Sequence, residues 1–182
     1  MLTPLITRYG VSLKPIIPAD LPSLRRWRNS DEVRLNMLSQ SLISASQQRL
    51  WYERISSDDS QCHWCVYVGD TRAGYANLKG FAKEPLMGQA TADGGLYLGQ
   101  SRVRHGLLAT AVALCQLDAA FEQFKIGQIQ TQVKSDNNSA LRLNQMLGYQ
   151  TQANDNYWIT LTLTAPSYVR ARQNLLRFFR HV

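Results

Sequence analysis

The feature that most constrains this chain is a change of hydrophobic period between residues 91 and 133. Residues 91–98 (TADGGLYL) read as a β-strand, whereas apolar side chains across residues 106–124 recur at α-helical spacing. The apolar face of this predicted helix is wide, which indicates a packed helix. Residues 126–133 return to a strand-like alternation. With the other strand and helix signals along the chain, this succession predicts one mixed-sheet domain.

The rest of the chain also alternates between strand and helix signals. Asp20 followed by Pro22 is typical of a helix start, with Asp20 as the expected N-cap. Asp136 is likewise the expected cap of a shorter helix, which Gly148 ends. The further strands are expected at residues 11–17, 62–69, 72–81 and 157–163, and the further helices at 21–29, from Ser44 or Ser46 onwards, at 136–147 and at 167–180.

Length and composition set broader limits. The chain has 182 residues, enough for one domain with a core and too few for two large ones. No apolar run approaches the roughly 20 residues of a membrane-spanning helix. The N-terminus lacks the charged start of a secretory signal. Together with three cysteines, which suit a reducing compartment, these observations predict a cytoplasmic protein without a membrane span.

The basic balance of the chain predicts an anionic partner. The formal net charge is +7, and four arginines but no acidic residue follow Asp155. The motifs of RNA-binding sheets and zinc fingers are absent, so nucleic acid is the less favoured partner. Residues 1–164 are expected to form the main domain and residues 165–182 a basic amphipathic helix. That helix is expected to pack on its own domain or on a subunit partner, which leaves a homodimer open. Binding to RNA or a membrane surface is the alternative. Its predicted apolar face comprises Tyr168, Ala171, Leu175 and Phe178.

Two segments carry a resemblance to a known superfamily. Residues 96–109 (LYLGQSRVRHGLLA) and 136–149 (DNNSALRLNQMLGY) resemble the coenzyme A-binding loop and the following helix of the GNAT superfamily of N-acetyltransferases. The resemblance covers roughly residues 10–163. It implies acetyl-coenzyme A as co-substrate, with no metal. It also implies an α/β (α+β) fold with a mixed, mostly antiparallel central sheet flanked by helices, to which the C-terminal helix is added.

The first segment matches a loop of the form Gln/Arg-x-x-Gly-x-Gly/Ala that opens a helix. Backbone N–H groups at a helix start are unpaired and attract phosphate, which suits the pyrophosphate of coenzyme A. Arg104 and Ala109 match the pattern, whereas Leu107 stands where the family has its first glycine. The coenzyme A contacts implied by this segment are Tyr97, Leu98, Arg102, Arg104, His105, Gly106, Leu107 and Ala109.

The second segment implies a further contact with coenzyme A and leaves open which group protonates the leaving thiolate. By resemblance, Asn137 contacts the pantetheine arm or shapes its groove. Asn144 stands where many relatives have the tyrosine that protonates the leaving thiolate. An asparagine can hydrogen-bond the sulfur but cannot act as an acid. Water, Tyr97 or Tyr149 would then have to supply the proton.

The N-terminal third narrows the resemblance. Residues 24–40 and 44–55 are similar to the start of the amino-sugar N-acetyltransferases of the pseudaminic acid pathway, with the ribosomal-protein N-acetyltransferases as close cousins. This implies a small anionic amine, best represented by a nucleotide-linked amino sugar, and arginines suit its phosphates. A solvated helix face with a core tryptophan is the alternative. The substrate-side candidates are Trp27, Arg28, Asn29, Arg34 and Gln40.

The chemistry implied by the resemblance needs a base and a donor. The amine must be neutral to attack, and Asp93 on the predicted strand 91–98 is the candidate base, a solvated aspartate being the alternative. A backbone N–H near Tyr97 or Leu98 is the expected donor to the thioester carbonyl, on a strand that its glycines would allow to bulge. Acetylation of a protein N-terminus is the second hypothesis, and a non-catalytic acyl-coenzyme A- or nucleic-acid-binding module the third.

The Cys62-x-x-Cys65 pair imitates a metal or redox motif. Residues three apart on a strand point to opposite faces, so these thiols are expected to diverge. The sequence therefore predicts no metal site.

Overall fold

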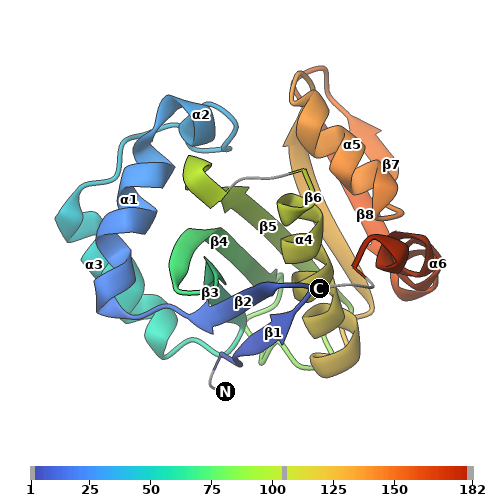
Figure 1. Cartoon of the computed structure of the whole chain (residues 1–182), viewed down its shortest axis with the longest axis horizontal. Helices are drawn as coiled ribbons and strands as arrows, with labels where there is room; N and C mark the ends of the chain where they lie inside the picture. The colour runs from blue at the N-terminus through green and yellow to red at the C-terminus, as the bar shows by residue number, and fades with distance from the viewer. Residues whose placement is uncertain (1–2, 104–105, 180–182) are drawn as a thin grey trace.

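The chain folds around one eight-stranded sheet in the order β1-β2-β3-β4-β5-β6-β8-β7 (Figure 1). The computed structural model describes residues 3–103 and 106–179, so the predicted contacts at Arg104 and His105 lie outside the described residues. Neighbouring strands are antiparallel except β5 and β6, which are parallel. The mixed, mostly antiparallel sheet is therefore confirmed. The strands are β1 (Ile6–Arg8), β2 (Val11–Pro15), β3 (Gln61–Val68), β4 (Thr71–Gly80), β5 (Thr91–Leu98), β6 (Gln128–Lys134), β7 (Gln150–Asn154) and β8 (Trp158–Thr164).

Helices cover both faces of this sheet. One group packs over β3 and β4, and the other lies over the opposite face and the β6–β8 end, as Figure 1 shows. The first group is α1 (Leu21–Asn29), α2 (Asp31–Arg34) and α3 (Ala45–Ser56). The second group is α4 (Leu108–Asp118), α5 (Asn138–Met146) and α6 (Ala165–Leu176). The short helical turns are η1 (Pro18–Asp20), η2 (Ser101–Val103), η3 (Ala119–Gln123) and η4 (Arg177–Phe179).

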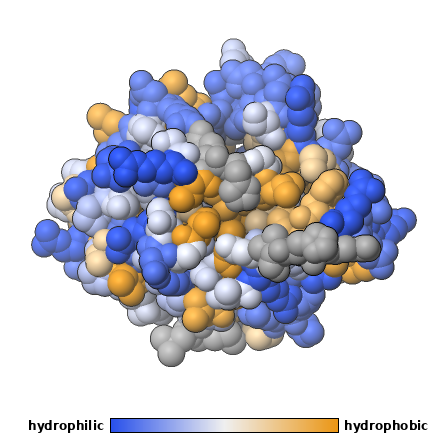
Figure 2. Space-filling model, in the orientation of Figure 1, coloured by the Kyte–Doolittle hydropathy of each residue, from blue (hydrophilic) through white to orange (hydrophobic). Residues whose placement is uncertain are grey.

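The alternation of β3 divides the interior into two cores. Trp64 and Val66 belong to the larger core under α4, whereas Cys65 and Tyr67 belong to a smaller core under α1 and α3. Cys62 lies with the larger core, so the two thiols of the Cys62-x-x-Cys65 pair diverge as predicted. On the face that carries α4, apolar surface gathers at the centre with hydrophilic surface to both sides (Figure 2).

Asp20 occupies the N-cap position of α1 as predicted, but its side chain makes no capping bond to that helix. The carboxylate instead accepts hydrogen bonds from Tyr67 Oη and Arg72 Nε, both at 2.6 Å, and from the backbone N of Ile17 at 3.0 Å.

The cap predicted at Asp136 is wrong. At α5 the cap is Asn137, whose Oδ1 accepts from the backbone N of Ala140 at 3.1 Å. The short elements β1 and α2 are not predicted by the sequence, because three or four residues are too few for a periodic pattern.

The tail helix α6 packs on α4 of the same chain. Tyr168 and Leu175 are buried as predicted, but Phe178 is 47% exposed and Phe179 is buried in its place. The prediction for Phe178 is wrong because α6 ends at Leu176 and the tighter turn of η4 changes the rotation per residue.

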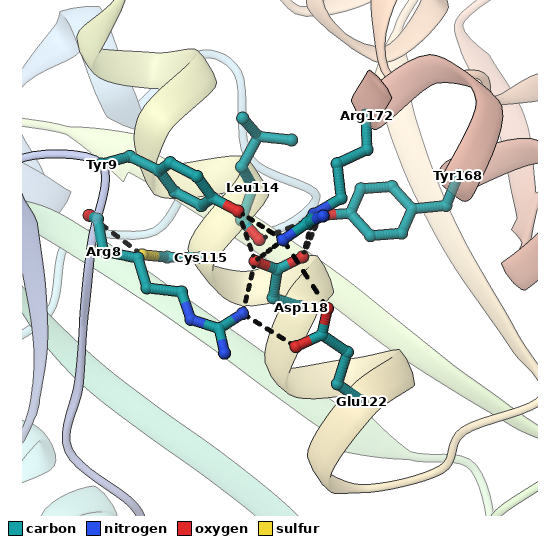
Figure 3. A network of polar contacts seen from close by, with 8 residues as sticks. All are labelled: Arg8, Tyr9, Leu114, Cys115, Asp118, Glu122, Tyr168 and Arg172. Carbon is teal, nitrogen blue, oxygen red and sulfur yellow. Dashed lines mark hydrogen bonds and ion pairs between the residues drawn. The ribbon is translucent and has the colours of Figure 1, made fainter. Parts of the chain in front are cut away.

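A polar cluster around Asp118, at the end of α4, joins α6 to β1 (Figure 3). Asp118 is 1% exposed, and its carboxylate accepts from Tyr9, Arg8, Tyr168 and Arg172. Burial alone would raise the pKa of Asp118, but these donors hold it below its ordinary value. One tail arginine therefore serves the fold rather than an external partner.

None of the helices within the described residues combines the length and the apolarity that crossing a membrane requires.

Candidate active site

The sheet opens beside Asp93. β5 pairs with β6 only over Thr91–Asp93, and the two strands then separate. On its other edge β5 keeps an unbroken register with β4 over Ala92–Leu98. The bulge expected in β5 is therefore wrong: the opening arises because β5 leaves β6. The glycines serve close packing instead, and a Cβ on Gly99 would lie 2.0 Å from the Trp27 ring.

A cavity of about 1400 Å³ fills this opening and reaches both faces of the sheet. Its walls come from α4 and α5 on one face and from α1, α3 and β4 on the other. Pockets for one small ligand commonly measure about 300–1,000 Å³. This cavity therefore has room for two substrates that meet at the gap between β5 and β6.

The start of α4 forms one end of the cavity. Its N-cap, Leu107, supplies no side-chain cap. By contrast, α3 begins with a capping box at Ser44, and α5 begins under Asn137. α1 and α6 also begin without a side-chain cap, but the start of α4 lines the cavity, so its first backbone N–H groups can bind an anion there. These uncapped donors fit the pyrophosphate of coenzyme A.

The departure at Leu107 has a physical explanation. The Leu107 side chain packs against the larger core, while its backbone contributes to the helix start. Gly106, Leu107 and Ala109 line the cavity, whereas Arg102 is exposed and does not. The Leu107 side chain therefore finds space against the core, although the family pattern has a glycine at this position.

The helix α5 supplies the second wall. Asn137 lines the cavity while it caps α5, so it shapes the groove through the helix start. Asn144 also lines the cavity, and its Nδ2 donates to the carbonyl of Ala140 at 2.8 Å. Tyr149 follows α5 and lines the cavity as well. Burial, and secondarily the charge of Asp93, raise the pKa of Tyr149 above its ordinary value, so its hydroxyl keeps its proton.

Asp93 lies where the two halves of the cavity meet. Burial raises the pKa of its carboxyl, although Lys79, its cross-strand partner on β4, opposes that rise. Among the described residues, no hydrogen bond to the Asp93 carboxylate is present. An ionised carboxylate with raised basicity at this position can accept a proton from a bound amine.

An aromatic wall borders the other half of the cavity. Tyr97 on β5 stacks on Tyr75 of β4 with ring centroids 5.1 Å apart. The Tyr97 hydroxyl donates to the carbonyl of Leu24 at 3.3 Å, which directs it toward α1. Tyr97 and Leu98 both line the cavity. The hydroxyl of Tyr97 therefore faces the half of the cavity that β4, α1 and α3 enclose, on the opposite sheet face from α4 and α5. This half is called the acceptor half below.

The predicted substrate residues divide into one that lines the cavity and four that do not. Arg28 lines it, and its buried Nη1 has no hydrogen-bond partner in the described residues. Trp27 is a core residue at 5% exposure. Asn29 holds the backbone of Ile43 through two hydrogen bonds of 2.9 Å.

The remaining two candidates build the loop between α2 and α3. Arg34 donates to the carbonyl of Gln40 at 3.0 Å, and Gln40 donates to the carbonyl of Leu35 at 3.3 Å. Together with Asn29, they shape the segment that closes the acceptor half instead of lining it.

Several residues that line the cavity are not predicted from the sequence. On β4, Tyr75, Asn77 and Lys79 alternate along one sheet face, and their partners in register on β5 are Tyr97, Gly95 and Asp93 respectively. The period-two spacing of polar residues in the predicted strand 72–81 is the signal that could have found them. Others come from helices whose faces the sequence does not assign to the site: Arg25, Trp51 and Arg54.

Within residues 3–103 and 106–179, no group of three His, Cys, Asp or Glu side chains is placed to hold a metal ion.

Comparisons with known proteins agree with this geometry. The acetyltransferase (GNAT) domain family matches residues 11–150. No curated protein sequence matches the chain. Among solved structures, a nucleotide-linked sugar GNAT, FdhC, gives a TM-score of 0.79 at 17% identity, covering 97% of this chain and 99% of that one.

Two further structures are similar. The spermidine N-acetyltransferase of Vibrio cholerae, in complex with CoA and spermine, gives a TM-score of 0.77 at 14% identity and covers 89% of this chain and 99% of that one. RimJ of Mycobacterium smegmatis, in complex with CoA-disulfide, gives 0.74 at 16% identity and covers 96% and 92%. At these identities the likeness establishes the fold.

The cavity at the gap between β5 and β6 lies beside an uncapped helix start, and the family match identifies the protein that carries it as an acetyltransferase. The chain belongs to the GNAT acetyltransferase family. It is an N-acetyltransferase that uses acetyl-coenzyme A as co-substrate.

Proposed function

We propose that this enzyme acetylates the primary amine of a small anionic acceptor, best represented by a nucleotide-linked amino sugar. The observation that carries the proposal is the charge of the acceptor half. Arg25, Arg28 and Arg54 line it from α1 and α3. Burial lowers the pKa of Arg28, Tyr97 opposes that change and Arg34 adds to it. Arg28 Nη2 donates to the carbonyl of Ser39, whereas Nη1 is buried without a partner in the described residues and could pair with a phosphate oxygen.

In this proposal Asp93 is the base. The ammonium of the acceptor loses a proton to the Asp93 carboxylate, and the free amine attacks the thioester carbonyl carbon. A C–N bond forms and the C–S bond breaks, and the proton that the attacking nitrogen loses on becoming an amide balances the proton that the leaving sulfur takes up. Asn144 cannot supply the proton for the leaving sulfur, because an amide is not an acid. Tyr149 is the proton donor that we favour, since its hydroxyl has no other partner in the described residues and its raised pKa keeps it protonated.

The three buried cysteines are unpaired, which agrees with the proposed cytoplasmic location.

The test is an amine panel in which release of the coenzyme A thiol is measured. The panel contains a UDP-linked 4-amino sugar, the same sugar without the nucleotide, spermidine and a peptide with a free N-terminus. The proposal predicts the highest kcat/KM for the UDP-linked sugar and a marked loss when the nucleotide is removed. A preference for the peptide would favour the second hypothesis, a protein N-terminus. Equal rates with and without the nucleotide would contradict an anionic acceptor.

A further inference from the structure

Asn77 is a buried polar side chain without a partner. It lies at the middle of β4, is 4% exposed and lines the cavity. Its Nδ2 is buried without a hydrogen-bond partner, and no hydrogen bond to its Oδ1 occurs among the described residues either. A buried amide in this state costs stability unless a ligand pairs with it.

Contacts of its backbone and of its strand neighbour fix Asn77 beside the cavity. Its carbonyl oxygen accepts from Gln116 Nε2 of α4 at 2.5 Å, which anchors the backbone from the opposite face of the sheet. Its cross-strand partner on β5 is Gly95. A Cβ at Gly95 would lie 3.1 Å from Asn77 Oδ1, so the glycine keeps the space beside this oxygen free of a side chain.

Neighbouring polar groups cannot satisfy Asn77 because they are engaged with each other. His63 lies opposite Asn77 on β3, but its Nε2 pairs with Gln61 Oε1 at 2.7 Å and its Nδ1 with Tyr75 Oη at 2.6 Å. Since Gln61 Oε1 only accepts, His63 donates through Nε2 and accepts the Tyr75 proton through Nδ1. Burial lowers the pKa of His63 to about 3, which keeps the ring neutral.

The position of Asn77 relative to the base sets what it can bind. Asp93 pairs with Lys79, two residues along the same face of β4 from Asn77. Diagonal neighbours of this kind lie about 7–8 Å apart. Side chains that converge over this distance can contact two adjacent groups of one small acceptor.

We propose that Asn77 is a specificity-determining residue that hydrogen-bonds a hydroxyl next to the acceptor amine. A hydroxyl both accepts, here from Nδ2, and donates, here to Oδ1. The enzyme therefore discriminates in favour of hydroxylated amines over plain alkyl amines. This inference rests on the proposed function only through the placement of the acceptor amine at Asp93.

The test uses trans-2-aminocyclohexanol and cyclohexylamine, which differ by one hydroxyl and carry no phosphate. The wild type is expected to show a kcat/KM about 10- to 100-fold higher for the amino alcohol. Asn77→Leu and Asn77→Ala should remove this preference by lowering kcat/KM for the amino alcohol alone. Asn77→Leu should unfold at the same temperature as the wild type or higher, because it removes an unpaired buried amide.

Three results would overturn the inference: equal use of the two amines by the wild type, no acetylation of the amino alcohol, or equal losses on both amines in the variants. A lower unfolding temperature of Asn77→Leu would assign Asn77 to the fold and also contradict it. Because neither probe is anionic, these outcomes are independent of the nucleotide test. Asp93→Asn should lower both rates equally, which separates failure of the base assignment from failure of Asn77.

Discussion

Two aspartates of this chain lie in enclosed positions, but only one of them has hydrogen-bond donors around its carboxylate in the described residues. Asp118 is surrounded by donors from β1, α6 and the loop after β1, and its pKa is held below the ordinary value despite burial (Figure 3). Asp93 lies in the cavity without a hydrogen bond from the described residues, and burial raises its pKa. The charge of Asp118 stabilises the fold at neutral pH, whereas the charge of Asp93 costs stability there.

The same contrast extends to the polar groups around each carboxylate. Near Asp118, hydroxyls and guanidinium groups from three segments are paired with one another. In and around the acceptor half, Arg28 Nη1, Asn77 Nδ2 and Arg34 Nε are buried without partners in the described residues, and Arg28 and Asn77 line the cavity. Buried polar groups are normally satisfied, so two exceptions that line one cavity indicate a place for a ligand.

The largest expected effect comes from Asp93→Asn. Loss of a general base should lower kcat/KM about 10²- to 10⁴-fold, measured as thiol release. The free energy of unfolding at neutral pH should stay the same or rise, because the folded-state pKa of Asp93 is raised. A raised pKa gives stability that is present at low pH and lost as pH rises through it, and asparagine has no such loss.

The pH profile sharpens this prediction. Wild-type kcat/KM should rise with pH as Asp93 ionises, with a midpoint above the ordinary aspartate value. Asp93→Asn should lose this limb and keep only the limb of the amine itself. An unchanged rate and profile in the variant would show that Asp93 is not the base.

The next largest effect should come from Asp118→Asn. Removing one partner of a buried ion pair commonly costs about 3–5 kcal/mol, which for a chain of this size is a Tm lower by roughly 6–20 °C. The wild-type contribution is present above the unfolded pKa and is lost as pH falls through the lowered folded pKa, so the gap between the two proteins should narrow in acid. Thermal unfolding followed by circular dichroism measures both.

Asp136→Asn is the matched control for Asp118→Asn. The Asp136 side chain is 69% exposed and contacts Lys134 at 2.9 Å, so the same substitution there should change stability by less than about 0.5 kcal/mol. Equal losses of stability at the two positions would show that burial and pairing of the Asp118 carboxylate do not stabilise the fold.

The fold was largely predictable because its elements have clear apolar patterns. The long apolar run of α4, which is buried on almost every side, and the strand pattern of β5 place the helix and the sheet correctly. Local competition between donors was not predictable: the Asp20 carboxylate binds Arg72, 52 residues away, instead of capping α1. Such a choice depends on tertiary contacts that no local pattern records.

The site was predictable only in part. The loop at Leu107 and the asparagine at Asn144 could be placed because they lie in one continuous segment each. The acceptor half is assembled from β4, α1 and α3, so Arg54 carries no local signature, and the period-two spacing that includes Asn77 does not show which face of the strand meets the cavity. Register between strands, as between Asn77 and Gly95, appears only once the sheet is formed.

A smaller effect is expected for Tyr149→Phe. If the Tyr149 hydroxyl protonates the leaving sulfur, kcat should fall about 10- to 100-fold with little change in KM for the acceptor. Tyr97→Phe is the control, because its hydroxyl donates to Leu24 in the acceptor half. Steady-state thiol release with both variants separates the two tyrosines, and an unchanged kcat in Tyr149→Phe would leave water as the proton source.

The smallest effect that we predict is on acceptor binding. Arg28→Met should raise KM for the UDP-linked sugar about 10-fold and leave kcat nearly unchanged, because it removes a charge-assisted contact made before and during the reaction. It should lower stability only slightly, because the wild-type guanidinium leaves Nη1 unpaired and donates through Nη2 to one loop carbonyl, that of Ser39. Arg26→Met, on the exposed face of the same helix, should change neither quantity. If Arg28→Met instead lowered stability strongly and left KM unchanged, Arg28 would belong with Asp118 among the residues that hold the fold.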